Sequence, residues 1–149
     1  MIVKALLCSL VAMFGLSDPK FFGTSMLQRP IITAPLVGLI LGDFQTGVII
    51  GGTLELVWLG FVNIGATVPA EVVTGSVIGT ALAILSGQGT DVALVIGIPV
   101  ALLGSYIKTV LYTFLSWFVH RADKYAENAD IEGVNRVHVA SAFFIIVPL

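Results

Sequence analysis

Apolar residues dominate the chain in long runs that charged side chains rarely interrupt. The charge-free runs cover residues 5–17, 30–42, 44–54, 56–70, 72–90, 92–107, 109–120 and 137–149. A helix that crosses a bilayer needs about 20 mostly apolar residues, because each residue advances only about 1.5 Å. Joining runs that a single charge separates predicts membrane segments at about residues 2–17, 30–42, 44–70, 72–90, 92–119 and 137–149.

Residues 30–70 differ from the other apolar segments, because glycine and proline repeatedly interrupt them. The stretch holds only two charges, Asp43 and Glu55, together with seven glycines and three prolines. It is too apolar for a soluble loop and too broken for two ideal helices. Irregular backbone at membrane depth persists only where protein or a water-filled cavity satisfies its polar groups. We therefore expect broken or re-entrant helices here, with a substrate site beside them.

Charge is concentrated in one place. Of the sixteen charged side chains, seven lie in residues 121–136, which have the composition of a surface loop or an exposed helix. The apolar run 137–149 that follows is short for a membrane span. We expect the chain to be the N-terminal portion of a longer protein or a truncated member of its family.

Composition agrees with this pattern. The chain of 149 residues is 57% hydrophobic and 11% charged, with a mean hydropathy of +1.04. Soluble domains are about 45–50% apolar and about 25% charged. The formal charge of −2 and the pI near 5.5 argue against nucleic-acid binding, and a single cysteine excludes an internal disulfide. The predicted class is an all-α polytopic membrane protein.

The two carboxylates of the interrupted region are the main candidates for chemistry. An ionisable group at membrane depth requires a partner or a hydrated cavity, so it indicates a functional site. Carboxylate oxygens accept hydrogen bonds from neighbouring hydroxyls, which suits a sugar. We expect Glu55 and Asp43 to bind substrate, with Thr53, Asn63 and Thr67 completing the polar lining. Asp43 has an alternative role as the cap of a following helix.

Trp58 follows Glu55 by three positions and shares its face if the segment is helical. Its ring would then offer an apolar platform to a sugar. The alternative is a packing residue or an interfacial anchor.

Several other residues have simpler interpretations. Gly75 and Gly79 are spaced for close helix packing. Arg29 and Lys20 are interpreted as markers of membrane borders. No nucleotide-binding, metalloprotease or nucleophile motif occurs, so no catalytic residue, metal site or cofactor is expected.

Long stretches resemble a known family. GGTLELVWLGFVNIGA (residues 51–66), RPIITAPLVGLILGDFQTGVIIGGT (29–53), PAEVVTGSVIGTALAI (69–84) and HRADKYAENADIEGVNRVHVAS (120–141) are similar to IIC membrane subunits of the mannose/fructose/sorbose family of the phosphoenolpyruvate-dependent sugar phosphotransferase system. Members are longer than this chain, by about 100 residues or more.

The resemblance implies a multi-pass subunit of the bacterial inner membrane, an elevator-type sugar permease with re-entrant hairpins. It implies pairing with a IID membrane subunit, as a trimer of IIC–IID heterodimers, and sugar phosphorylation by cytoplasmic IIB supplied by IIA. It also carries the sugar-binding role to Glu55, Thr53 and Asn63, then to Asp43 and Thr67.

Two other functions remain open from the residues alone. One is an ion-coupled secondary sugar transporter with Asp43 or Glu55 as the carrier of the proton or cation. The other is a truncated membrane scaffold that does not transport.

Overall fold

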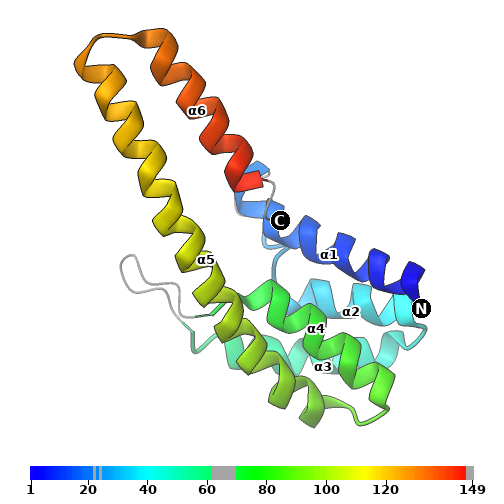
Figure 1. Cartoon of the computed structure of the whole chain (residues 1–149). Coiled ribbons are helices and arrows are strands. Elements are labelled where there is room, and N and C mark those ends of the chain that lie inside the picture. The colour runs from blue at the N-terminus through cyan, green and yellow to red at the C-terminus, as the bar shows by residue number, and fades with distance from the viewer. Residues whose placement is uncertain (22, 24, 62–69, 147–149) are drawn as a thin grey trace. The chain divides into compact units, whose positions relative to one another are not determined.

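A computed structural model describes residues 1–21, 23, 25–61 and 70–146, and this part of the chain is helical (Figure 1). Its helices are α1 (Ile2–Phe21), α2 (Pro30–Leu41), α3 (Phe44–Trp58), α4 (Val72–Ser86), α5 (Thr90–Glu127) and α6 (Ile131–Ile146). The chain divides into two compact units, Met1–Ser105 and Tyr106–Leu149. The all-α class predicted from the sequence is confirmed.

In the first unit, helix ends coincide with residues suited to them. Pro30 occupies the first turn of α2, where its missing N–H is not needed. Gly42 ends α2 in the left-handed region, with φ +98°, and Gly87 ends α4 with φ +68°. Asp43 caps α3 by accepting a hydrogen bond from the Thr46 amide. These local signals confine the chain reversal between α2 and α3 to residues 42–43.

The interrupted region is more regular than the sequence suggested. Residues 30–41 and 44–58 form two continuous helices, so the glycines within α3 are not breaks. A Cβ on Gly47 would lie 2.8 Å from the Ala34 carbonyl oxygen, and one on Gly38 would lie 2.9 Å from the Gly47 Cα. Glycine is required at these positions because the backbones of α2 and α3 are in contact there. Residues 62–69 of the predicted broken segment lie outside the described residues.

Helix α4 packs against the first turns of α5 in the same manner. A Cβ on Gly75 would lie 2.6 Å from the Gly97 carbonyl oxygen, and one on Gly79 would lie 2.7 Å from the Ala93 carbonyl oxygen. The packing role predicted for Gly75 and Gly79 is therefore confirmed.

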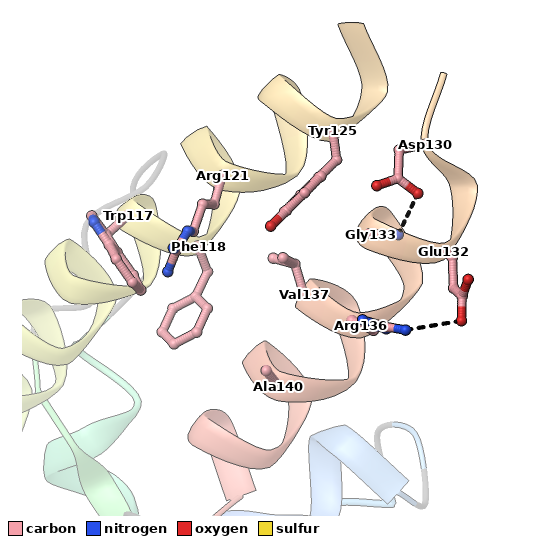
Figure 2. Close-up of a pocket in the computed structure, with 10 residues that line it drawn as sticks. All are labelled: Trp117, Phe118, Arg121, Tyr125, Asp130, Glu132, Gly133, Arg136, Val137 and Ala140. Carbon is pink, nitrogen blue, oxygen red and sulfur yellow. Dashed lines mark hydrogen bonds and ion pairs between the residues drawn. The ribbon is translucent and has the colours of Figure 1, made fainter. Parts of the chain in front are cut away.

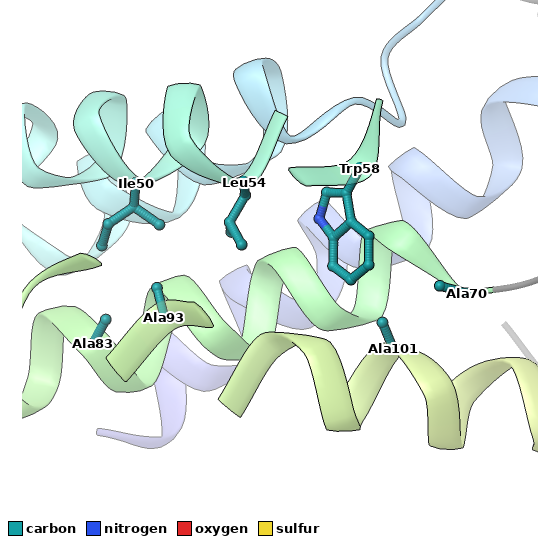
Figure 3. Packing of buried hydrophobic residues seen from close by; sticks show 7 residues of the cluster. All are labelled: Ile50, Leu54, Trp58, Ala70, Ala83, Ala93 and Ala101. Carbon is teal, nitrogen blue, oxygen red and sulfur yellow. The ribbon is translucent and has the colours of Figure 1, made fainter. Parts of the chain in front are cut away.

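The main apolar core of this unit lies beneath α3 (Figure 3). Ile50, Leu54 and Trp58 recur every four residues, and all three are buried. This spacing places them on one side of the helix, where they meet alanines of α4 and α5. The core contacts fix which side of α3 faces inward.

Two helices of the described chain are long and apolar enough to cross a membrane, α1 through its residues Ile2–Pro19 and α5. Only 17% of the membrane-length window of each helix is buried inside the chain, so neither resembles the core helix of a soluble protein. The helices α2 and α3, of 12 and 15 residues, reach only about 18 and 22 Å, less than a hydrocarbon core of about 30 Å.

The second unit is a helical hairpin made by the later part of α5 and by α6 (Figure 1). The polar segment 121–136 is helical except at residues 128–130, so it takes the form of an exposed helix rather than a loop. Asp130 begins α6 by accepting a hydrogen bond from the Gly133 amide, at 2.9 Å. Helix α6 begins at Ile131, six residues before the expected apolar segment, because helix formation does not stop at charged residues.

Candidate functional site

Glu55 lies in the last turn of α3, beside the start of α2. Its Oε1 lies 2.9 Å from Nε of Arg29, and its Oε2 accepts a hydrogen bond from the Ile31 amide at 3.4 Å. The side chain is 15% exposed. Both carboxylate oxygens therefore have a partner, and the carboxylate remains partly accessible.

Each charge of the pair is favoured by the dipole of the neighbouring helix and disfavoured by that of its own, because Glu55 lies in the last turn of α3 and Arg29 is the N-cap of α2. The carboxylate lies at the N-terminus of α2, where the first amides of a helix carry partial positive charge. Arg29 meets the last turn of α3, where the partial charge is negative. The ion pair thus joins the two open ends of the α2–α3 hairpin, opposite its turn at residues 42–43.

Arg29 has a partner that the sequence did not predict. Besides the membrane border that it was expected to mark, it is the ionic partner of Glu55. Its carbonyl oxygen accepts hydrogen bonds from the amides of Ile32 and Thr33, at 2.9 and 3.0 Å. The sequence did contain a signal for the position of Arg29. Pro30 directly after it predicts the first turn of a helix, which places Arg29 at the N-terminus of that helix.

Two of the predicted site residues bond within their own helix or turn. The Thr53 hydroxyl donates to the Ile49 carbonyl oxygen at 2.9 Å and is half-buried. Asp43 accepts from the Thr46 amide at 3.0 Å, as the capping alternative anticipates. Thr53 and Glu55 are two positions apart on α3, so their side chains point to different sides of the helix, and Asp43 lies at the opposite end of that helix.

Trp58 is a core residue. Its side chain is 2% exposed and lies among the buried apolar residues of the core (Figure 3). Its indole N–H donates to the Ser76 hydroxyl at 3.1 Å, and its ring meets Phe61 edge to face. A ring buried in this way has no free face for a sugar, so the packing alternative describes it better. Asn63 and Thr67 lie outside the described residues.

Two buried carboxylates were not singled out from the sequence. Asp18 is fully buried near the end of α1 and accepts hydrogen bonds from the Ser25 hydroxyl and the Leu27 amide. Glu71 is 8% exposed and caps α4, accepting from the Thr74 amide at 2.7 Å. Each borders a charge-free run, so the sequence alone offered no reason to expect either of them to be buried.

A polar hollow of about 350 Å³ lies in the second unit, between the later part of α5 and α6 (Figure 2). Arg121 stacks on the Trp117 ring, 4.7 Å from its centre, and Arg136 pairs with Glu132 at 3.0 Å. Glu132 is 78% exposed, so this second ion pair is a solvated counterpart of the pair in the first unit. Of the predicted site residues that the structure describes, none lines this hollow.

The Arg29–Glu55 pair supplies hydrogen-bonding chemistry in the described part of the chain. No group of three or more metal-ligating side chains occurs among the described residues. The Arg29–Glu55 pair offers donors and acceptors side by side, which is the pattern needed to hold a hydroxylated molecule.

These features define an all-helical membrane protein with a charged pair set in a hairpin of short helices. A family model described as the PTS system sorbose-specific IIC component matches residues 2–149, and the chain belongs to this family of IIC permease components of sugar phosphotransferase systems.

Curated relatives agree. The PTS system mannose-specific EIIC component of Escherichia coli K12 is 41% identical over 116 residues, covering 78% of this chain and 44% of the relative. The fructose permease IIC component of Bacillus subtilis is 38% identical over 78% of this chain and 44% of its own length. A putative N-acetylgalactosamine permease IIC component 2 of Escherichia coli K12 is 41% identical over 69% of this chain and 77% of the relative.

The fold has solved counterparts. The structure of the mannose transporter ManYZ in complex with microcin E492 matches with a TM-score of 0.77 at 35% identity, covering 98% of this chain and 58% of that chain. A second structure, described as a membrane protein, matches with a TM-score of 0.75 at 34% identity. The chain spans less than half the length of the mannose and fructose relatives.

Proposed function

We propose that this chain acts as the IIC permease component of a mannose-family sugar phosphotransferase system. With a IID membrane subunit it forms the path by which a hexose or amino sugar crosses the bacterial inner membrane. Cytoplasmic IIB, supplied with phosphate by IIA, phosphorylates the sugar, and this chain carries no catalytic residue. The assembly proposed is a trimer of IIC–IID heterodimers.

The observation that carries this proposal is the match of family and fold along almost the whole chain. Relatives named for mannose, fructose, sorbose and N-acetylgalactosamine support a sugar with several hydroxyl groups. The short helices α2 and α3 support a re-entrant hairpin, because neither reaches across a hydrocarbon core.

Within this function, we assign sugar binding to Glu55 with Thr53, and extend it to Asn63, Thr67 and Asp43. The support for Glu55 is its position: a carboxylate that is 15% exposed, is held by Arg29 and the Ile31 amide, and is still partly accessible. Trp58 supports the site from the core side and does not contact sugar.

The residue assignment is tested by Glu55→Gln in cells that depend on this system for uptake of radiolabelled mannose, fructose or sorbose. We expect uptake of the transported sugar to fall at least tenfold at unchanged protein abundance, since a charged acceptor is replaced by a neutral amide. Glu132→Gln, the same change in the exposed ion pair, serves as the control and should leave uptake unchanged. Normal uptake by the Glu55 variant would contradict the assignment.

Energy coupling is tested separately. Deleting the IIA and IIB components should abolish accumulation of the phosphorylated sugar, whereas dissipating the proton gradient should leave uptake driven by phosphoenolpyruvate intact. If dissipating the proton gradient alone stops uptake, an ion-coupled carrier is supported instead. Co-purification with IID without any sugar binding would support a scaffold.

A further inference from the structure

The contact between Arg29 and Glu55 allows a further step, which rests on the proposed function. We propose that Arg29 is a positioning residue of the sugar site: it holds the Glu55 carboxylate in one orientation and presents further N–H groups beside it. Together the two side chains bind neighbouring hydroxyl groups of the sugar.

The backbone around Arg29 is fixed on both sides. Pro30 follows it in the first turn of α2, and the Arg29 carbonyl oxygen accepts two amide hydrogen bonds from that helix. Before it, the Leu27 amide donates to Asp18 at 3.1 Å, and Asp18 is fully buried. The guanidinium therefore extends from an anchored position, which reduces the freedom that it loses when it binds.

The contact leaves binding capacity on both partners. Arg29 meets Glu55 through Nε, which is one of the five N–H donors of a guanidinium. The Glu55 oxygens have about four lone-pair positions, and the contacts with Arg29 and Ile31 use two of them. A pair of adjacent sugar hydroxyls can donate to the carboxylate and accept from the guanidinium at the same time.

The exposure and charge of the Arg29–Glu55 pair favour a role in ligand binding over a purely structural role. The side chains are 32% and 15% exposed, compared with 77% and 78% in the Arg136–Glu132 pair. The first pair is thus shielded enough for its hydrogen bonds to be strong, yet open enough to be reached. The guanidinium also supplies the opposite charge that a carboxylate requires in apolar surroundings.

The test measures sugar affinity and thermal stability of the purified complex of this chain with its IID partner, using mannose, fructose and sorbose as probes. Arg29→Gln should weaken binding of the accepted sugar at least tenfold. Arg29→Lys keeps the charge but loses the planar donor set, so it should retain stability and bind with intermediate affinity. Arg136→Gln, in the exposed pair, is the matched control and should leave the affinity unchanged.

The combined variant Arg29→Gln/Glu55→Gln separates positioning from independent binding. Because Arg29 both orients Glu55 and donates to the sugar, the double variant should bind more weakly than Glu55→Gln alone, but by less than the sum of the two single losses. If the Arg29–Glu55 ion pair only stabilises the fold, Arg29→Gln and Arg29→Lys should lower the melting temperature, and the folded complex should bind sugar with unchanged affinity. That result would overturn the inference.

The failure of this inference differs from a failure of the proposed function. If Glu55→Gln weakens binding and neither Arg29 variant does, only the role of Arg29 is wrong. If neither Glu55→Gln nor the Arg29 variants change the affinity, the assignment of Glu55 as the sugar-binding residue is wrong as well. Should Arg29→Gln fail to assemble, Arg29→Lys alone still decides between the two roles through its affinity at normal stability.

Discussion

Glu55 and Trp58 lie three residues apart on α3 and have different environments. Trp58 is in the core with a hydrogen bond to Ser76, whereas Glu55 meets Arg29 at the end of α2. Three positions along a helix correspond to about 300°, so residues at this spacing are neighbours without facing the same partner. The short spacing between Glu55 and Trp58 on α3 therefore does not give the two residues the same environment.

The role of Trp58 in stability can be measured. Trp58→Phe should lower the free energy of unfolding by about 1–3 kcal/mol, because it removes the hydrogen bond to buried Ser76 and leaves a small cavity. Adding Ser76→Ala should recover part of the loss, and the double-mutant cycle should show coupling of about 1 kcal/mol. Sugar affinity should remain unchanged, and a large fall in affinity at normal stability would restore the platform role of Trp58.

Thr80 provides a second test at the level of one side chain. It is fully buried in α4, and its hydroxyl has no hydrogen-bond partner within the described part of the chain. Thr80→Val keeps the shape and removes the unpaired hydroxyl, so stability should rise by about 1 kcal/mol. The control is Thr113→Val on α5, where an exposed hydroxyl donates to the Thr109 carbonyl oxygen. A clear loss of stability in the Thr80 variant would contradict the expectation.

The sequence was informative about residues whose surroundings are local. Asp43 was recognised as a possible cap because its partner, Thr46, lies three positions away. The partner of Glu55 could not be found in this way, since Arg29 is 26 positions distant in sequence and meets it only when α2 and α3 fold back on each other. Asp18 was missed for the same reason, because its burial depends on the segment at residues 25–27.

At the level of helices, the charge-free runs located the elements but not their ends. α5 continues to Glu127 and α6 begins at Ile131, although both ends are rich in charge. The absence of charge reports the cost of insertion into lipid, whereas a helix needs only backbone hydrogen bonds and tolerates charge on an exposed face. Within α3, Gly47 and Gly51 serve helix contact rather than a break, whereas residues 62–69 of the expected broken segment lie outside the described residues.

Alanine substitutions distinguish glycines at a helix–helix contact from glycines with open space around them. Gly75→Ala would place its Cβ 2.6 Å from both the Ala101 Cβ and the Gly97 carbonyl oxygen, so α4 and α5 must separate. We expect a loss of about 1–3 kcal/mol in unfolding free energy.

Gly52→Ala in α3 is the matched control, because a Cβ there meets nothing within 4 Å. It should be neutral or stabilising by up to about 1 kcal/mol, as alanine favours helix more than glycine does. Unfolding of the purified variants in detergent compares the two. Equal stability of both variants would show that the α4–α5 contact contributes little.

For the molecule as a whole, the length of α5 determines how the chain meets the membrane. Its 38 residues extend over about 57 Å, which exceeds the roughly 40–45 Å of a bilayer with its headgroups. At the average tilt of about 20° the helix still spans about 54 Å, so we expect one end of it to project into water. The charged segment that follows Trp117 identifies the C-terminal end, near residues 121–127, as the projecting part.

Cysteine labelling tests this placement directly. Asn128→Cys and Val95→Cys, each in a Cys8→Ala background, both put a thiol at an exposed position of α5 or just beyond it, and Val95 is 74% exposed. If lipid covers Val95, a membrane-impermeant maleimide should label only the Asn128 variant in intact vesicles, and both variants after denaturation. The vesicle orientation that permits labelling gives the side on which residues 128–130 lie. Equal labelling of both variants without denaturant would mean that this face of α5 meets water, and the assignment of α5 as a membrane span would then be wrong.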